Sequence, residues 1–203
     1  SIVIPNGFAI EKRSDEISKK SFAPSLITVG NVTERKGQHN VINALPLLLK
    51  TYPKLKYHIV GIPTEKKKLE VLVSQLGVAK AVIFHGRVTE KEKKRLLEKA
   101  DIFIMLSEMT STGDVEGFGI AILEANALGL PAIGAKGCGI EDAVKDKYSG
   151  KLIDSKDPVQ LKNALHEILS NYEEYSKGAK TWSENFRWDI IIMKYIKTLE
   201  NKQ

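Results

Sequence analysis

The hydrophobic positions along the chain switch repeatedly between a strand pattern and a helix pattern. Short runs of apolar, often β-branched residues alternate with longer stretches in which apolar residues recur every three or four positions. The first run, residues 25–29, ends at Gly30, and the stretch after it places Val41, Ile42 and Leu45 on a helical period. The alternation predicts repeated strand–helix units.

The ends of the segments carry recognisable stop and start signals. Thr89 and Glu92 form a capping-box pattern before one helix, and Asp157 followed by Pro158 opens another. The predicted strands are 25–29, 55–60, 81–84, 102–106, 131–133 and 151–153. The predicted helices are 36–50, 65–76, 89–99, 119–128, 140–145, one that begins at 158, 172–183 and 188–201.

The strands are apolar throughout and do not alternate with polar residues, which is typical of a parallel sheet buried on both faces. We therefore predict an α/β fold with a Rossmann-like parallel sheet and helices on both faces. Ligands of such sheets bind beyond the carboxyl ends of the strands. Functional residues are expected in the loops after Val29, Val60, Phe84, Leu106 and Ile133.

Composition narrows the classes of partner. The chain has 203 residues, a net charge of +6 and a pI near 9.2. The basic runs at 66–68 and 91–95 have acidic neighbours and no interleaved aromatic residues, so they indicate solvated helix faces and disfavour nucleic acid. Peripheral contact with a membrane surface or contact with a phosphate-rich partner is the alternative. Cys138 is the only cysteine, which excludes an internal disulfide and favours a reducing compartment.

The loop after the first strand carries Arg35 and Lys36 at the start of a predicted helix. Cations in this position oppose the helix dipole unless an anion lies nearby. Backbone N–H groups at a helix start also favour phosphate. The pair is a candidate diphosphate clamp, and a solvated turn is the alternative.

The loop before helix 119–128 is the second candidate. Gly117 and Gly119 would allow the backbone to approach a ligand closely. Glu124 follows among Ile122 and Leu123, so its carboxylate needs a polar partner, and ribose hydroxyls would serve. A capping or salt-bridged glutamate is the alternative.

A third glycine-rich turn, residues 134–142, contains Cys138, which we interpret as a small packed residue because no histidine partner is evident. The chain has no Walker loop, no G-x-G-x-x-G after the first strand and no zinc-ligand spacing. It also lacks the Asp-x-Asp pair of metal-dependent sugar transfer.

Together these loops resemble the C-terminal domain of family 4 glycosyltransferases with the GT-B fold. Gly117-Phe118-Gly119 lies between Glu116 and Glu124, as in the family's pair of glutamates separated by seven residues. Residues 123–131 and the segment Ile4-Pro5-Asn6-Gly7 also match. Asp114-Val115 is most similar to mannosyltransferase-like members.

The resemblance implies roles for residues at matching positions. Lys36 would bind the donor diphosphate, Glu124 the ribose hydroxyls, and Glu116 the transferred sugar. The remaining implied donor contacts are Gly30, Gly86, Arg87 and the N–H groups of Phe118, Gly119 and Ile120.

One position departs from the family pattern. Asn31 stands where the family usually has arginine, and it carries no charge to stabilise a leaving diphosphate. We expect Arg35 to compensate; weaker donor binding or an altered donor are the alternatives.

The implied reaction transfers a hexose from a UDP-, GDP- or ADP-sugar to an acceptor hydroxyl, with retention and without a metal or other cofactor. The products would belong to polysaccharide, lipopolysaccharide or glycolipid synthesis. The expected location is the cytoplasm, including the cytoplasmic face of the inner membrane. The sequence names neither the base, the sugar nor the acceptor.

The resemblance also implies a division of the chain. Residues 1–24 would be an interdomain linker, 25–183 the nucleotide-sugar-binding domain, and 184–203 a helix that crosses to an N-terminal acceptor domain outside this chain. The chain alone is then expected to bind donor without transfer, and to leave Trp188, Ile191 and Ile192 partly exposed.

Two other classes remain open. One is another GT-B-type enzyme, such as a sugar-nucleotide epimerase; a phosphorylase would need a pyridoxal lysine site, which no segment suggests. The other is a non-catalytic nucleotide-binding module, which unchanged ligand binding after Glu116→Ala and Glu124→Ala would favour. The donor-site hypothesis requires Arg35, Lys36, Glu116 and Glu124 to converge on one cleft.

Overall fold

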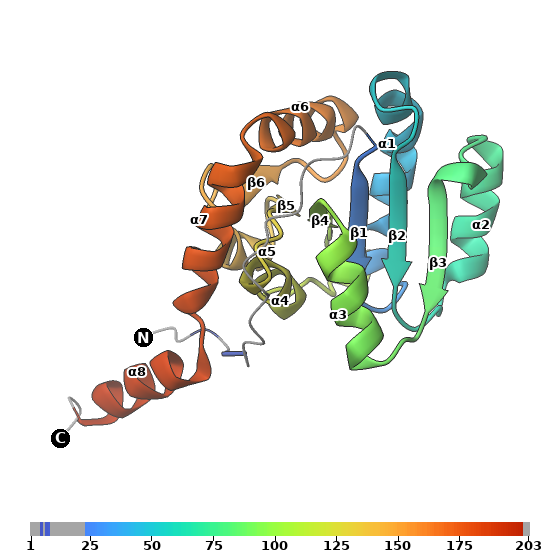
Figure 1. Ribbon diagram of the computed structural model, residues 1–203. Coiled ribbons are helices and arrows are strands. Elements are labelled where there is room, and N and C mark those ends of the chain that lie inside the picture. The colour runs from blue at the N-terminus through green and yellow to red at the C-terminus, as the bar shows by residue number, and fades with distance from the viewer. Residues whose placement is uncertain (1–4, 6, 9–22, 201–203) are drawn as a thin grey trace.

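A computed structural model describes residues 5, 7–8 and 23–200 of the chain. Six strands form one parallel sheet in the order β3-β2-β1-β4-β5-β6 (Figure 1). The strands are β1 (Ser25–Val29), β2 (Lys56–Val60), β3 (Val82–Gly86), β4 (Ile102–Met105), β5 (Ala132–Ala135) and β6 (Gly150–Ile153). The predicted α/β class and parallel sheet are confirmed.

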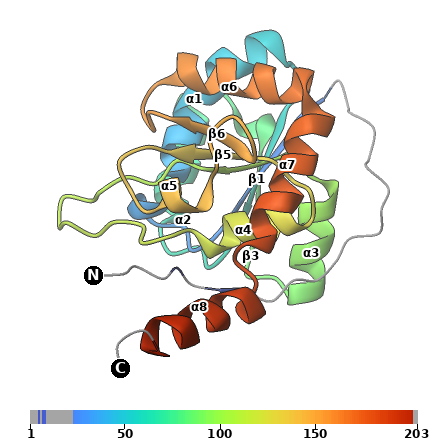
Figure 2. The same cartoon turned by 90° about the vertical axis from the view of Figure 1, so that its left-hand side faces the viewer.

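Helices cover both faces of the sheet (Figures 1 and 2). One face carries α1 (Gln38–Thr51), α2 (Lys66–Gln75) and α6 (Pro158–Ser170). The other carries α3 (Glu90–Lys99), α4 (Ile120–Ala127) and α5 (Ile140–Ala143). The helix α7 (Tyr172–Glu184) reaches both layers, because its two tyrosines join the first hydrophobic cluster and Trp182 packs against the second.

The central strands separate two hydrophobic layers. Leu26 of β1 and Ile104 of β4 face the first layer, whereas Ile27 and Phe103 face the second, and all four are fully buried. Successive side chains of a strand point to opposite faces of the sheet, so a strand that is apolar throughout contributes side chains to both hydrophobic layers. This burial fixes the sheet and therefore the edge at which its loops emerge.

The predicted helix at 36–50 begins differently in the structure. A short 3-10 turn, η1 (Glu34–Lys36), comes first, Gly37 then adopts a left-handed conformation with φ of 66°, and α1 begins at Gln38. A second 3-10 turn, η2 (Ala79–Ala81), precedes β3. The predicted caps are confirmed: Thr89 accepts from the Glu92 amide, and Asp157 accepts from the first-turn amides of α6.

The last helix, α8 (Trp188–Glu200), lies apart from the sheet in both views. Trp188 and Ile192 are exposed as predicted, by 46% and 49%, but the prediction for Ile191 was wrong, since that side chain is fully buried. The start of the helix lies against residues 7 and 8, so this chain itself covers one side of it. The predicted linker over 1–24 falls mostly outside the described residues.

Candidate functional site

Two loops meet at the carboxyl edge of the sheet, where the strand order reverses. The strands β1 and β4 are neighbours in the sheet, but the segments that follow them lie on opposite faces. After β1 the chain continues through η1 into α1 on one face, and after β4 it continues through a loop into α4 on the other. In open parallel sheets this divergence leaves the crevice in which ligands bind. Two of the three candidate loops of the sequence analysis, those after β1 and β4, lie on either side of this point, which is called the crevice below.

Gly37 holds the first loop against the second. A Cβ on this residue would lie 1.7 Å from the Leu106 carbonyl oxygen, an overlap that no side chain could relieve. The amide of Glu108 also donates to the carbonyl of Arg35 at 3.2 Å. The residue before α1 must therefore be glycine, because its φ is positive and because no space is left for a Cβ atom. This close contact fixes Arg35 and Lys36 beside the end of β4.

The second loop is held by its own hydrogen bonds and by the third. Thr110 and Asp114 close a turn, in which Thr110 N donates to Asp114 O at 2.9 Å and Asp114 N to Thr110 Oγ1 at 3.0 Å. Further along, Gly139 N donates to the carbonyl of Glu116 at 2.9 Å. A Cβ on Gly139 would lie 2.1 Å from the Gly117 oxygen, so the third glycine-rich turn positions Glu116 by close backbone contact.

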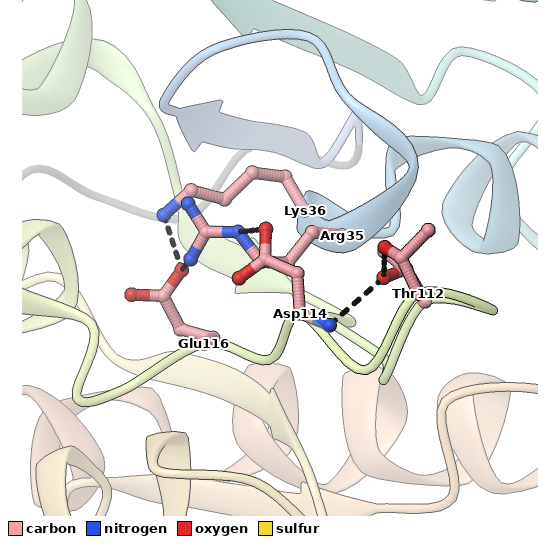
Figure 3. Close-up of polar contacts among 6 residues, drawn as sticks. Arg35, Lys36, Thr112, Asp114 and Glu116 are labelled. Atoms are coloured by element: carbon pink, nitrogen blue, oxygen red, sulfur yellow. Dashed lines mark hydrogen bonds and ion pairs between the residues drawn. The ribbon is translucent and has the colours of Figure 1, made fainter.

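Four charged side chains form a compact cluster across the crevice (Figure 3). Glu116 Oε2 accepts from Arg35 Nη1 at 2.8 Å and from Lys36 Nζ at 2.5 Å. Arg35 Nε also pairs with Asp114 Oδ2 at 3.0 Å. Glu116 is 8% exposed. The expected anion beside the two cations exists, and in this structure a carboxylate supplies it.

Glu124 takes a different partner. Its Oε2 pairs with Lys93 Nζ of α3 at 3.1 Å, and Lys93 also pairs with Glu90 at 2.7 Å. Burial alone would lower the pKa of Lys93, but hydrogen bonds and attraction from the two carboxylates outweigh it and raise that pKa. Of the four residues expected to converge, the structure joins Arg35, Lys36 and Glu116, while Glu124 faces a cavity of about 230 Å³ beside α3.

The backbone at the start of α4 has the form expected of a phosphate-facing turn. Gly119 is left-handed, with φ of 87°, and immediately precedes the helix. Phe118 is buried with its ring 5.6 Å from that of Phe186, whereas Ile120 is exposed. The buried side chain of Phe118 anchors this turn, and Gly119 is buried beside it.

The other predicted contacts lie around the same edge. The stem of Lys36 crosses over Gly30, where an added Cβ would come within 3.3 Å of Lys36 Cε. Asn31 is exposed, and its carbonyl accepts from Gln38 Nε2 at 3.1 Å. Gly86, with φ of 69°, ends β3, and exposed Arg87 follows it, two strands away from β1.

A histidine pair fixes the end of β3. His58 Nδ1 and His85 Nε2 are 2.9 Å apart, and the rings stack with centroids at 5.2 Å. Burial is the main cause that lowers the pKa of both imidazoles. A neutral pair can share one hydrogen bond, which ties β3 to β2 just before Gly86.

Several site residues were missed from the sequence. Lys93 was interpreted as part of a solvated basic run, although its place three residues after Glu90 could have indicated a paired lysine. Buried oxygens of Thr33, Gln38 and Ser107 lack a hydrogen-bond partner among the described residues. Thr33 and Ser107 lie in the loops after β1 and β4, and Gln38 begins α1, so the polar groups of water or a ligand could satisfy these oxygens.

The remaining candidates behave as ordinary structural groups. Burial raises the pKa of the Cys138 thiol, which agrees with a packed residue. Within the described part of the chain, no three His, Cys, Asp or Glu side chains gather as metal ligands. None of the described helices combines the length and apolar character needed to cross a bilayer.

Comparison with known proteins identifies the family. The sequence profile described as glycosyl transferases group 1 matches residues 10–186. The chain belongs to this family. It is 30% identical over 170 residues to the GDP-mannose-dependent alpha-(1-6)-phosphatidylinositol monomannoside mannosyltransferase of Mycolicibacterium smegmatis. The match covers 81% of this chain and 44% of the mannosyltransferase, so the chain spans less than half of that relative.

Comparison with solved structures identifies the fold of this chain. Sucrose-phosphate synthase from Thermosynechococcus elongatus matches with a TM-score of 0.80 at 21% identity, over 98% of this chain and 51% of that one. Anabaena HepE, solved with UDP and glucose, matches with a TM-score of 0.73 at 22% identity, over 88% and 48%. The fold is that of the C-terminal domain of GT-B glycosyltransferases, as the sequence predicted.

Proposed function

We propose that this chain is the donor-binding domain of a retaining glycosyltransferase and holds a nucleoside diphosphate sugar in the crevice between the β1 and β4 loops. The convergence of Arg35, Lys36 and Glu116 on one point of that crevice carries the proposal. The family provides the reaction class. The mycobacterial relative is named as GDP-mannose-dependent, and HepE was solved with UDP and glucose, so GDP-mannose and UDP-glucose are the first donors to test.

Each group has a role that its position supports. Lys36 and Arg35 bind the diphosphate and stabilise the negative charge that develops on it as the bond to the anomeric carbon breaks. The amides at the start of α4 add hydrogen bonds to phosphate. Glu116 orients the sugar hydroxyls, and Glu124 binds the ribose after exchanging its contact with Lys93.

The reaction forms a bond from the acceptor oxygen to the anomeric carbon and breaks the bond from that carbon to the diphosphate oxygen. The proton of the acceptor hydroxyl passes to the departing diphosphate oxygen, so that the step balances. In this proposal Arg35 and Lys36 neutralise the charge of the leaving diphosphate, as a divalent metal does in metal-dependent transfer. Asn31 brings no charge to the edge, so Arg35, which pairs with Glu116, is the compensating cation.

Transfer in this proposal needs an acceptor domain in addition to the described one. Seven exposed large apolar side chains on α8 support a surface that another domain covers: Trp188, Ile190, Ile192, Met193, Tyr195, Ile196 and Leu199. Domain closure would bring the acceptor hydroxyl to the anomeric carbon. We accordingly propose that residues 184–203 bind that domain and that this chain alone binds donor without transfer.

Isothermal titration calorimetry tests the proposal directly. We expect measurable binding of at least one donor when the chain is titrated with GDP-mannose, UDP-glucose and ADP-glucose in EDTA. Binding in EDTA would also support the metal-free clamp. The absence of binding heat for all three at millimolar ligand would contradict the donor-site proposal.

A further inference from the structure

The charged cluster at the crevice is electrically balanced without any ligand. Two cations, Arg35 and Lys36, face two carboxylates, Asp114 and Glu116. The side chains of Lys36 and Glu116 are only 14% and 10% exposed, so water screens their attraction weakly. Asp114 is 64% exposed and, among the described residues, forms an ion pair only with Arg35, so Glu116 is the main counter-ion.

This arrangement has a consequence for any diphosphate that enters. A single carboxylate oxygen, Glu116 Oε2, accepts from both cations. Phosphate oxygens would use the same donor groups of Arg35 and Lys36. A diphosphate must therefore separate Glu116 from its partners, and the freed carboxylate then lies in a largely buried position where it needs new hydrogen-bond donors.

The exchange requires the side chain of Glu116 to rotate away from the two cations. Its main chain is held by the bond from Gly139 N, but its side-chain contacts among the described residues are the ion pairs themselves. Gly117 beside it is exposed, with nothing within 4 Å of an added Cβ. A rotation of the side chain can release the cations while the loop keeps its path.

We propose that Glu116 competes internally for the diphosphate-binding cations and so sets the preference for a sugar nucleotide over the free nucleoside diphosphate. This inference rests on the proposed function. The hydroxyls of a bound hexose can donate to the displaced carboxylate, whereas a free nucleoside diphosphate leaves it without donors. The carboxylate therefore favours the donor before transfer and returns to Lys36 and Arg35 as the diphosphate product leaves.

The test compares wild type with Glu116→Gln by calorimetry in EDTA, using GDP and GDP-mannose, and UDP and UDP-glucose. The amide competes weakly for cations, so we expect the free diphosphate that wild type binds to bind about tenfold more tightly to the variant. The corresponding sugar nucleotide should gain much less. The ratio of the two dissociation constants should therefore fall, which loss of structure alone would not produce.

Two variants serve as controls. Asp114→Asn removes a carboxylate that contacts Arg35 only and should tighten diphosphate binding by a smaller factor. Glu173→Gln changes the net charge equally on the exposed first turn of α7 and should change neither constant. Thermal unfolding of each variant confirms that the fold is kept.

The outcomes separate the two proposals. If wild type binds a nucleotide and Glu116→Gln binds the free diphosphate no more tightly, the competition is overturned while the donor site stands. If neither protein binds any of the four nucleotides at millimolar concentration, the proposed function fails and the competition fails with it.

Discussion

Replacement of Gly37 by alanine is expected to lower the free energy of unfolding by about 3 kcal/mol, the largest stability effect that we predict for a single methyl group in this chain. Two causes add. The residue has a φ of 66°, which costs an alanine roughly 1–2 kcal/mol. The new Cβ would also lie 1.7 Å from the Leu106 carbonyl oxygen, so the backbone after β4 must move.

Gly77 provides a matched control. It has nearly the same φ, 67°, but nothing lies within 4 Å of an added Cβ. Gly77→Ala should therefore cost only the conformational part, about 1 kcal/mol, in chemical denaturation followed by circular dichroism. Equal losses for the two variants would show that the contact between Gly37 and Leu106 contributes nothing.

Replacement of Lys36 by alanine is expected to weaken nucleoside diphosphate binding by roughly 1–3 kcal/mol, which corresponds to about five- to 150-fold in Kd. Lys36 is largely buried, and its stem is laid over Gly30, so its ammonium group has little freedom to lose on binding. Arg35 would remain, which is why the loss should be incomplete. Calorimetry with the free diphosphate and with the sugar nucleotide measures it.

Lys68→Ala is the control for this prediction. Lys68 also pairs with a glutamate, Glu65, but it stands on α2 and is 77% exposed. Its removal changes the net charge by the same amount and should leave the dissociation constant unchanged. An unaltered Kd for Lys36→Ala would remove that lysine from the site.

Much of the fold could be predicted because burial and caps leave a local signal. The apolar runs at β1 and β4 have no polar face to expose, and this alone predicts a parallel sheet covered on both sides. Thr89 and Asp157 cap their helices through side-chain atoms that the sequence displays. The requirement for glycine at position 37 could not be predicted from the local sequence, because it comes from close contact with Leu106, which is far away in the sequence.

Part of the site could also be predicted, because some of its residues leave a local signal in the sequence. Arg35 and Lys36 gave a local anomaly, two cations at a helix start, and the structure supplies the missing anion from Glu116. The ion pair of Glu124 with Lys93 depends on how α3 packs beside α4, which no local pattern reports. The start of α8 likewise lies against residues 7 and 8, at the opposite end of the chain.

A second polar cavity offers a specific alternative to the crevice. It measures about 400 Å³ and lies between α1 and the start of α6. Glu108 lines it and pairs with His39 at 3.0 Å and with Lys156 at 3.0 Å. A small polar ligand could bind there, on the α1 and α6 side of the sheet, without contact with Lys36 or Glu116.

Mapping of amide chemical shifts by NMR on the isotope-labelled chain separates the two sites most directly. Titration with the sugar nucleotide that binds most tightly should shift the amides of Gly30, Gly37, Phe118 and Gly119 most strongly, because they border the crevice. The largest shifts at His39, Asn43 and Ser155, with those four glycine and phenylalanine amides unmoved, would contradict a donor site between the β1 and β4 loops.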